Sequence, residues 1–105
     1  GQFRYFLRKT VEQYLDGGVL ILCDIVGGTP YNESYRLMLE HPRQIRLLAN
    51  VNLPMLIEAG LSISSCKNID ELCETVARAG TESMKTAVIA PEDESTNKEI
   101  ENFFQ

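Results

Sequence analysis

Several features that define whole classes of protein are missing from this sequence. The longest apolar run, Val19–Cys23, is far too short to cross a bilayer. The N-terminus lacks the charged segment and apolar stretch that mark a secretory signal peptide. Internal repeats and low-complexity stretches are absent as well. We therefore expect no leader peptide and no insertion into a membrane.

Cysteine and histidine are scarce. The chain has three cysteines at irregular spacing, Cys23, Cys66 and Cys73, and one histidine, His41. An odd cysteine count without a CxxC pair does not indicate a disulfide framework. A structural zinc site would have to recruit all four residues from scattered positions. We expect reduced thiols, a cytoplasmic location and no metal or other cofactor.

Positive charge is in deficit. Ten lysines and arginines against fifteen acidic residues give a net charge of −5 over 105 residues. Nucleic-acid binding and electrostatic attachment to a membrane both require clustered positive charge. We therefore expect no nucleic-acid partner. The hydrophobic fraction of 44% and charged fraction of 24% are ordinary for a folded, soluble domain.

Helical and strand patterns alternate along the chain. Apolar spacings of three and four residues predict helices, and the short continuous apolar runs predict strands that are buried on both faces. The expected order is helix 3–15, strand 19–23, helix 29–40, strand 45–49, helix 52–60, a helix from residue 68, strand 84–90 and a last helix from residue 96. This order predicts an α/β fold with three layers and a doubly wound, largely parallel sheet.

Local signals set the expected helix ends and faces. Thr29 with Pro30 is typical of an N-cap and first helical position, and His41-Pro42 of a helix end. Asn52 is the expected cap of the next helix, which Gly60 should end, and Asn68 to Glu71 forms a capping-box pattern. The expected core face of the helix over 29–40 consists of Tyr31, Tyr35, Met38 and Leu39.

Two loops carry the candidate chemistry. Residues 24–32 and 50–55 follow the carboxyl ends of two strands, where ligands bind in open α/β sheets, and both loops lead into helix N-termini that favour an anion. A structural interpretation stands beside each: a simple turn, a loop cap or a helix cap. The candidates are Asp24, Gly27, Gly28, Thr29, Asn32, Asn50 and Asn52.

The segment from Val19 to Asn32 resembles the central motif of the mannose-family IIA component of the bacterial phosphoenolpyruvate:sugar phosphotransferase system. That motif is an apolar strand followed by Asp, two variable residues and Gly-Gly-Ser/Thr-Pro-Phe-Asn. Residues 51–55, Val-Asn-Leu-Pro-Met, followed by Glu58-Ala59, are similar to the family's second signature. The resemblance covers residues 3 to 90, which we interpret as a partial IIA domain. Residues 91–105 are the expected acidic linker and short C-terminal helix.

The resemblance implies a phosphoryl relay on a histidine, from the phosphocarrier protein HPr to a IIB domain or subunit. It further implies a homodimer that exchanges its last strand, here matched by 84–90. Asp24 would orient the histidine. Gly27, Gly28, Thr29 and Asn32 would surround the phosphoryl group, with Asn50 and Asn52 in the second loop. Asn50 stands where the family has Gly, and Asn tolerates the same left-handed backbone.

The phospho-accepting histidine of the family follows a first strand for which this sequence has no counterpart, and His41 matches no functional position. We therefore expect an N-terminally truncated domain, inactive alone, in which Val19–Cys23 lacks a neighbour and exposes an apolar edge, or a sheet completed by another copy. Two alternatives stay open: a IIA-like regulatory domain of a sugar-operon activator, and a fragment that acts only through oligomerisation.

Overall fold

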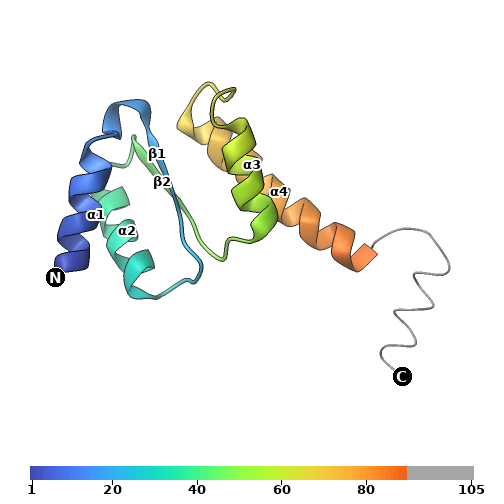
Figure 1. The fold of residues 1–105 in the computed structure, drawn as a ribbon, viewed down its shortest axis with the longest axis horizontal. Coiled ribbons are helices and arrows are strands. Elements are labelled where there is room, and N and C mark those ends of the chain that lie inside the picture. The colour runs from blue at the N-terminus through green and yellow to red at the C-terminus, as the bar shows by residue number, and fades with distance from the viewer. Residues whose placement is uncertain (90–105) are drawn as a thin grey trace.

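Two short parallel strands form the middle layer of the computed structural model. Strand β1 (Val19–Leu22) pairs with β2 (Ile45–Leu48), and the register runs from Val19 opposite Ile45 to Leu22 opposite Leu48. Helices α1 (Gln2–Glu12) and α2 (Thr29–Glu40) cover one face, while α3 (Leu53–Ser62) and α4 (Ile69–Ile89) cover the other (Figure 1). The predicted α/β class with three layers is confirmed.

The structure describes residues 1–89, with side chains as far as Met84. The expected acidic linker and the last helix, with Ile100, Phe103 and Phe104, lie outside this range.

Each face of the sheet has its own apolar core. On the α1 and α2 side, Val11, Leu37 and Ile45 are buried, and Val19 and Ile21 pack against them. On the α3 and α4 side, the buried residues are Met55, Leu72 and Val76, and Leu20, Leu22 and Leu48 pack against them. The alternation of β1 side chains between the two cores explains its continuous apolar sequence.

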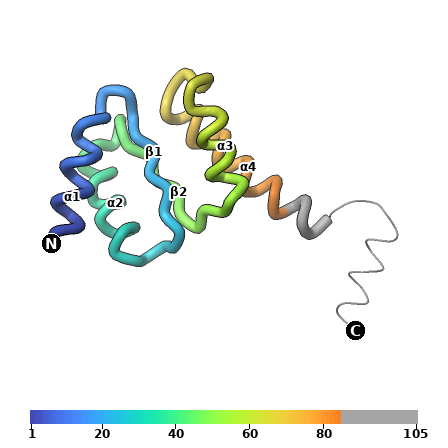
Figure 2. The backbone as a smooth tube through the Cα atoms, in the orientation of Figure 1, coloured from blue at the N-terminus to red at the C-terminus, as the bar shows by residue number. Residues whose placement is uncertain are grey.

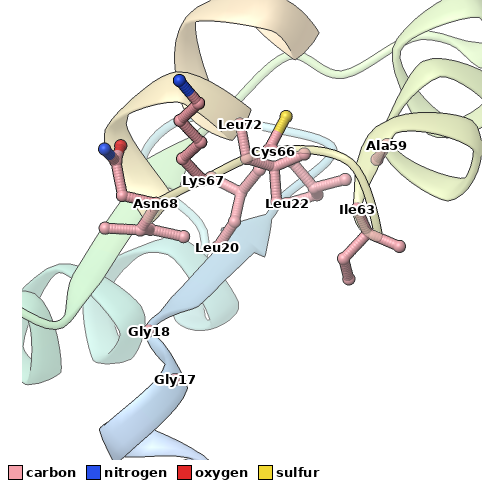
Figure 3. Close-up of a pocket in the computed structure, with 11 residues that line it drawn as sticks. Gly17, Gly18, Leu20, Leu22, Ala59, Ile63, Cys66, Lys67, Asn68 and Leu72 are labelled. Atoms are coloured by element: carbon pink, nitrogen blue, oxygen red, sulfur yellow. The ribbon is translucent and has the colours of Figure 1, made fainter.

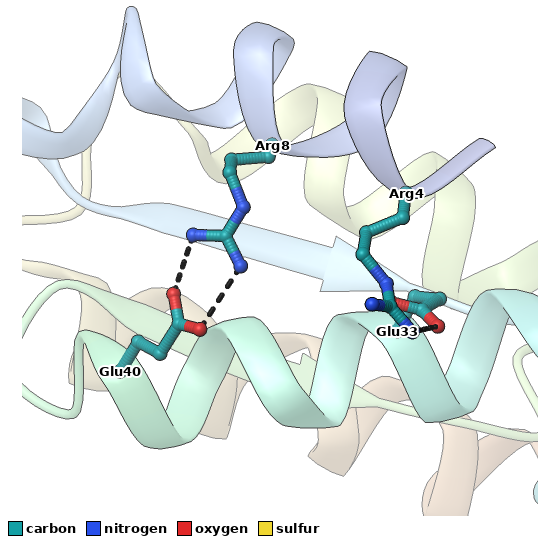
Figure 4. A network of polar contacts seen from close by, with 4 residues as sticks. All are labelled: Arg4, Arg8, Glu33 and Glu40. Atoms are coloured by element: carbon teal, nitrogen blue, oxygen red, sulfur yellow. Dashed lines mark hydrogen bonds and ion pairs between the residues drawn. The ribbon is translucent and has the colours of Figure 1, made fainter. Parts of the chain in front are cut away.

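Two ion pairs join α1 to α2 on the solvent side (Figure 4). Arg4 Nε donates to Glu33 Oε2 at 2.8 Å, and Arg8 Nη2 donates to Glu40 Oε1 at 2.9 Å. Both contacts are bidentate. The arginine hydrogen bonds lower the pKa of the Glu33 and Glu40 carboxyls below the ordinary value of 4.5. These pairs link α1 to α2 at the surface, above the buried contact between Val11 and Leu37.

The strand predicted over Met84–Ala90 is wrong. Residues as far as Ile89 continue α4, which therefore runs for 21 residues. An isolated strand would leave its backbone groups unpaired, whereas a helix pairs them within itself. The cap at Asn68 starts this helix, since Asn68 Oδ1 accepts from Glu71 N at 2.8 Å. Within the described range the sheet has two strands rather than three.

Three smaller expectations also need correction. Helix α1 ends at Glu12, not at residue 15, and a 3₁₀ turn, Leu15–Gly17, follows it. Helix α3 continues past Gly60 to Ser62. The core face of α2 is built on Ser34 and Leu37, whereas Tyr35 and Leu39 are 43% and 62% exposed. Met38 packs against the core as predicted, and Tyr31 is half-buried.

The edge of β1 opposite β2 has no strand beside it among the described residues. Helix α1 lies to one side of this edge and α3 to the other (Figure 2). An unpaired apolar edge at Val19–Cys23 was expected from the sequence.

Candidate functional site

The two candidate loops leave the same edge of the sheet. Cys23 N donates to Leu48 O at 2.8 Å, and Cys23 O accepts from Val51 N at 3.2 Å. These bonds extend the strand pairing by a few residues beyond Leu22. Asp24 and Asn50, which directly adjoin the bonded residues, therefore lie at one end of the sheet, as parallel strands require.

The first loop is fastened by two side chains. Asp24 Oδ1 accepts from Ile25 N at 2.9 Å, and Asn32 Nδ2 donates to Gly27 O at 3.3 Å. Gly27 has φ +89°, a left-handed conformation that disfavours any side chain. Gly28 has φ −77° and needs no such freedom. Asp24, Gly27 and Asn32 thus shape the turn that leads into α2.

The N-terminus of α2 carries no side-chain cap. The sequence predicted Thr29 as the N-cap, but Gly28 occupies that position and Thr29 is already helical. The cause is the extended backbone of Gly28, whose carbonyl accepts the first helical bond from Asn32 N at 2.9 Å. A helix start without a capping oxygen leaves its first N–H groups available to an anion.

The second loop shows the opposite arrangement. Asn52 Oδ1 accepts from Met55 N at 3.1 Å, so Asn52 caps α3 as predicted. Asn50 has φ +57°, which agrees with its predicted left-handed conformation. Asn52 therefore already satisfies one donor of α3, while Asn50 shapes the turn before it.

A cavity of about 550 Å³ borders the second loop. Asn50, Asn52 and Met55 line one side of it, and Gly80 and Met84 of α4 line the other. Gly80 is buried, and a Cβ atom there would lie 2.7 Å from Met55 Sδ. The absence of a side chain at Gly80 therefore determines how closely α4 approaches α3 behind this loop.

The lone histidine is remote from both loops. His41 is the C-cap of α2, and the helix of twelve residues separates it from the N-cap Gly28 by about 20 Å. Residues 1–84 contain no group of three or more His, Cys, Asp or Glu side chains that could hold a metal ion. None of the helices over residues 1–89 is long and apolar enough to cross a membrane.

Sequence reasoning missed two apolar residues at the tip of the first loop. Ile25 and Val26 are 58% and 56% exposed beside Asp24. The sequence places both residues in the loop that begins at Asp24, but it assigned them no role there. Exposed aliphatic side chains beside polar loop residues are suited to contact with a protein partner.

Comparison with known proteins agrees with this geometry. The model of the EIIA-man family, described as the PTS system fructose IIA component, matches residues 3–77, which is more than half of the chain. The chain belongs to the EIIA-man family. The matched range includes both candidate loops.

The relatives of this EIIA-man chain include mannose-specific EIIAB components. The PTS system mannose-specific EIIAB component of Escherichia coli (strain K12) is 32% identical over 74 residues, and the protein of the same name in Shigella flexneri gives the same values. These residues make up 70% of this chain and 23% of each relative, so the chain spans about a quarter of their length.

A solved structure is similar as well. The crystal structure of phosphotransferase system component EIIA from Streptococcus agalactiae has a TM-score of 0.64 and 31% sequence identity. The match covers 76% of this chain and 64% of that one. Fold and sequence therefore point to the same family.

Proposed function

We propose that this chain provides the phosphoryl-transfer loops of a cytoplasmic IIA component of the phosphotransferase system. In this proposal the domain takes a phosphoryl group from HPr and passes it to a IIB domain or subunit during uptake of mannose-family sugars. The named relatives are transport components, which supports this role. They lend no support to the alternative of a regulatory domain in a transcriptional activator.

The observation that carries the proposal is the uncapped N-terminus of α2 at the carboxyl edge of the sheet. Its first-turn N–H groups and the positive end of the helix dipole favour the charge that develops on a phosphoryl group in transfer. Gly27 and Asn32 hold the loop in the shape that keeps this helix end open. Asn50, in the second loop, lies at the same end of the sheet.

Asp24 is the expected positioning residue. Its exposed carboxylate would accept the ring N–H of the phospho-accepting histidine, so that the other ring nitrogen attacks phosphorus in line. His41 is not that acceptor in our proposal, because it lies at the far end of α2. The resemblance assigns the acceptor to a turn after a strand for which this sequence has no counterpart.

The proposal is tested by calorimetric titration of the chain with HPr. We expect Ile25→Ser to weaken binding by about five- to tenfold, as loss of an apolar contact at a protein interface does. The matched control is Leu39→Ser, since Leu39 is 62% exposed against 58% for Ile25 but lies near the other end of α2. Absence of HPr binding, or an equal loss with both variants, would contradict the proposal.

A further inference from the structure

We propose that Cys23 and Ser34 are positioning residues of the phosphoryl site, because their buried contact holds the start of α2 against the end of β1. This inference rests on the proposed function and deepens it. Neither residue touches the phosphoryl group in this proposal. Both act through Asp24, which directly follows Cys23, and through the open first turn of α2.

The first observation is a hydroxyl group within an apolar layer. Among residues 1–84, Ser34 is the one buried polar residue, and it is 1% exposed. Leu37, three positions further along α2, belongs to the apolar core on the same side of the sheet. Withdrawing a hydroxyl from water costs free energy unless it has a hydrogen-bond partner. Packing alone therefore does not explain a serine at this position.

The partner of Ser34 is the side chain at the end of β1. Side chains alternate along a strand, and Leu20 and Leu22 line a cavity of about 200 Å³ on the α3 side of the sheet (Figure 3). Cys23 therefore faces α2. Its thiol is 5% exposed and donates to Ser34 Oγ, with 4.0 Å between sulfur and oxygen.

This contact contributes direction rather than stability. A thiol is a weak donor, so the contact adds little to the free energy of unfolding. The apolar contacts of Leu37 and Met38 with the same core have no preferred direction, whereas a hydrogen bond has one. The contact between Cys23 and Ser34 therefore selects one placement of α2 among those that apolar packing allows.

Cys23 also joins the two halves of the candidate site. Its backbone N–H donates to Leu48 O at 2.8 Å, and its carbonyl accepts from Val51 N at 3.2 Å. The same residue is thus bonded to the end of β2, to the second loop and, through its side chain, to α2. A shift of α2 relative to Cys23 changes the distance between Asp24 and the helix N-terminus.

The helix carries such a shift to its first turn. Ser34 lies beyond the N-cap Gly28 by about 9 Å along the helix axis. Each turn of a helix is bonded to the next, and here Asn32 N donates to Gly28 O at 2.9 Å. A displacement at Ser34 therefore moves the N–H groups that would face the phosphoryl group.

The first test measures amide hydrogen exchange in the free chain. Ser34→Ala removes the acceptor at nearly constant volume, and we expect exchange at Asn32 to accelerate about threefold relative to His41, at the other end of α2. Ser62→Ala is the matched control, because the Ser62 hydroxyl also has a side-chain partner, Glu58 Oε1 at 2.8 Å, but lies at the end of α3. It should leave this ratio unchanged.

The second test compares the dissociation constants for phosphorylated and unphosphorylated HPr by calorimetry. Ser34→Ala and Cys23→Ala should each lower the preference for the phosphorylated form about threefold. The double variant should lose no more than either single variant, because the two residues act as one pair. Ser62→Ala should keep the full preference, and a contribution to overall stability alone would not move it.

The outcomes separate this inference from the proposed function. Absence of any preference in the wild-type chain would contradict the proposed function, and this inference with it. A wild-type preference that Ser34→Ala and Cys23→Ala leave intact would overturn this inference alone. Equal acceleration of exchange at Asn32 and His41 in Ser34→Ala would overturn it as well, since the contact would then serve only overall stability.

Discussion

The contact between Gly80 and Met55 predicts an unusual response to an ordinary helix-stabilising substitution. Replacing a helical glycine by alanine favours the helix by about 1 kcal/mol, because the unfolded chain loses freedom. At Gly80 the added methyl group would lie 2.7 Å from Met55 Sδ and 2.8 Å from Met55 Cγ. Met55 is only 6% exposed and packs with Leu72 and Val76, so it cannot turn aside freely.

Overpacking of this kind costs about 1–3 kcal/mol and exceeds the propensity gain. We therefore expect Gly80→Ala to destabilise the domain by about 1 kcal/mol. Gly60 is the matched control, since it also lies within a helix and a methyl group there meets nothing within 4 Å. Gly60→Ala should stabilise the domain by about 0.5–1 kcal/mol.

Urea denaturation followed by far-UV circular dichroism measures both variants, with an unchanged slope as the sign that only stability has changed. In a Met55→Ala background the clash is removed, and Gly80→Ala should then stabilise the domain as Gly60→Ala does. Equal stabilisation by both glycine variants in the wild-type background would refute the packing of α4 against α3 described here.

Other perturbations test the loops and the helix pair. Asn50→Ala should cost about 1 kcal/mol in the free energy of unfolding because of the left-handed backbone, while Asn50→Gly should cost little. Asn52→Ala should cost about 1 kcal/mol through loss of the α3 cap, and Asn52→Asp should restore it in the same denaturation assay. The pKa of Glu33 and of Glu40 is lowered in the folded state. The stability that these two carboxylates contribute is therefore fully present above the ordinary pKa of 4.5, and it is lost as the pH falls through the lowered pKa. Urea midpoints measured between pH 6 and 3, an acidic range around that ordinary pKa, should therefore fall less steeply in the Glu33→Gln, Glu40→Gln double variant than in an Asp16→Asn control.

The sequence predicted best where a local signal and the tertiary environment agree. The apolar runs at Val19 and Ile45 became the two paired strands, and Asn52 caps its helix as expected. Asn50 adopts the left-handed backbone for which Asn is the best substitute for Gly. In each case the residue type itself limits the backbone or the burial, so tertiary packing had little to change.

The misplaced features depend on contacts that no local pattern contains. Residues 84–89 are apolar enough for a strand, but strand formation needs a neighbour to pair with, and the structure instead continues α4. The core face of α2 was placed wrongly because one of its two buried residues is a serine, Ser34. A polar residue gives no signal in a pattern that is read from apolar spacing. The uncapped start of α2 was missed because Thr29 is the better cap by composition, while backbone geometry gives that position to Gly28.

The candidate site follows the same division. Its two loops could be located from sequence because strands end where apolar runs end, and parallel strands bring their carboxyl ends together. The sequence could not show that the α2 terminus is open while the α3 terminus is capped. In our proposal, that difference distinguishes the loop that receives the phosphoryl group from the loop that supports it.

We propose that the loop before α2 is the phosphoryl site of this EIIA-man domain. The most direct measurement is an amide NMR titration of the ¹⁵N-labelled chain with phosphorylated HPr, compared with unphosphorylated HPr. We expect the phosphoryl-dependent shifts to concentrate in residues 24–32, above all at Gly28 and Thr29, with smaller shifts at 50–52. Phosphoryl-dependent shifts centred on His41 and the far end of α2, or shifts identical for both forms of HPr, would contradict it.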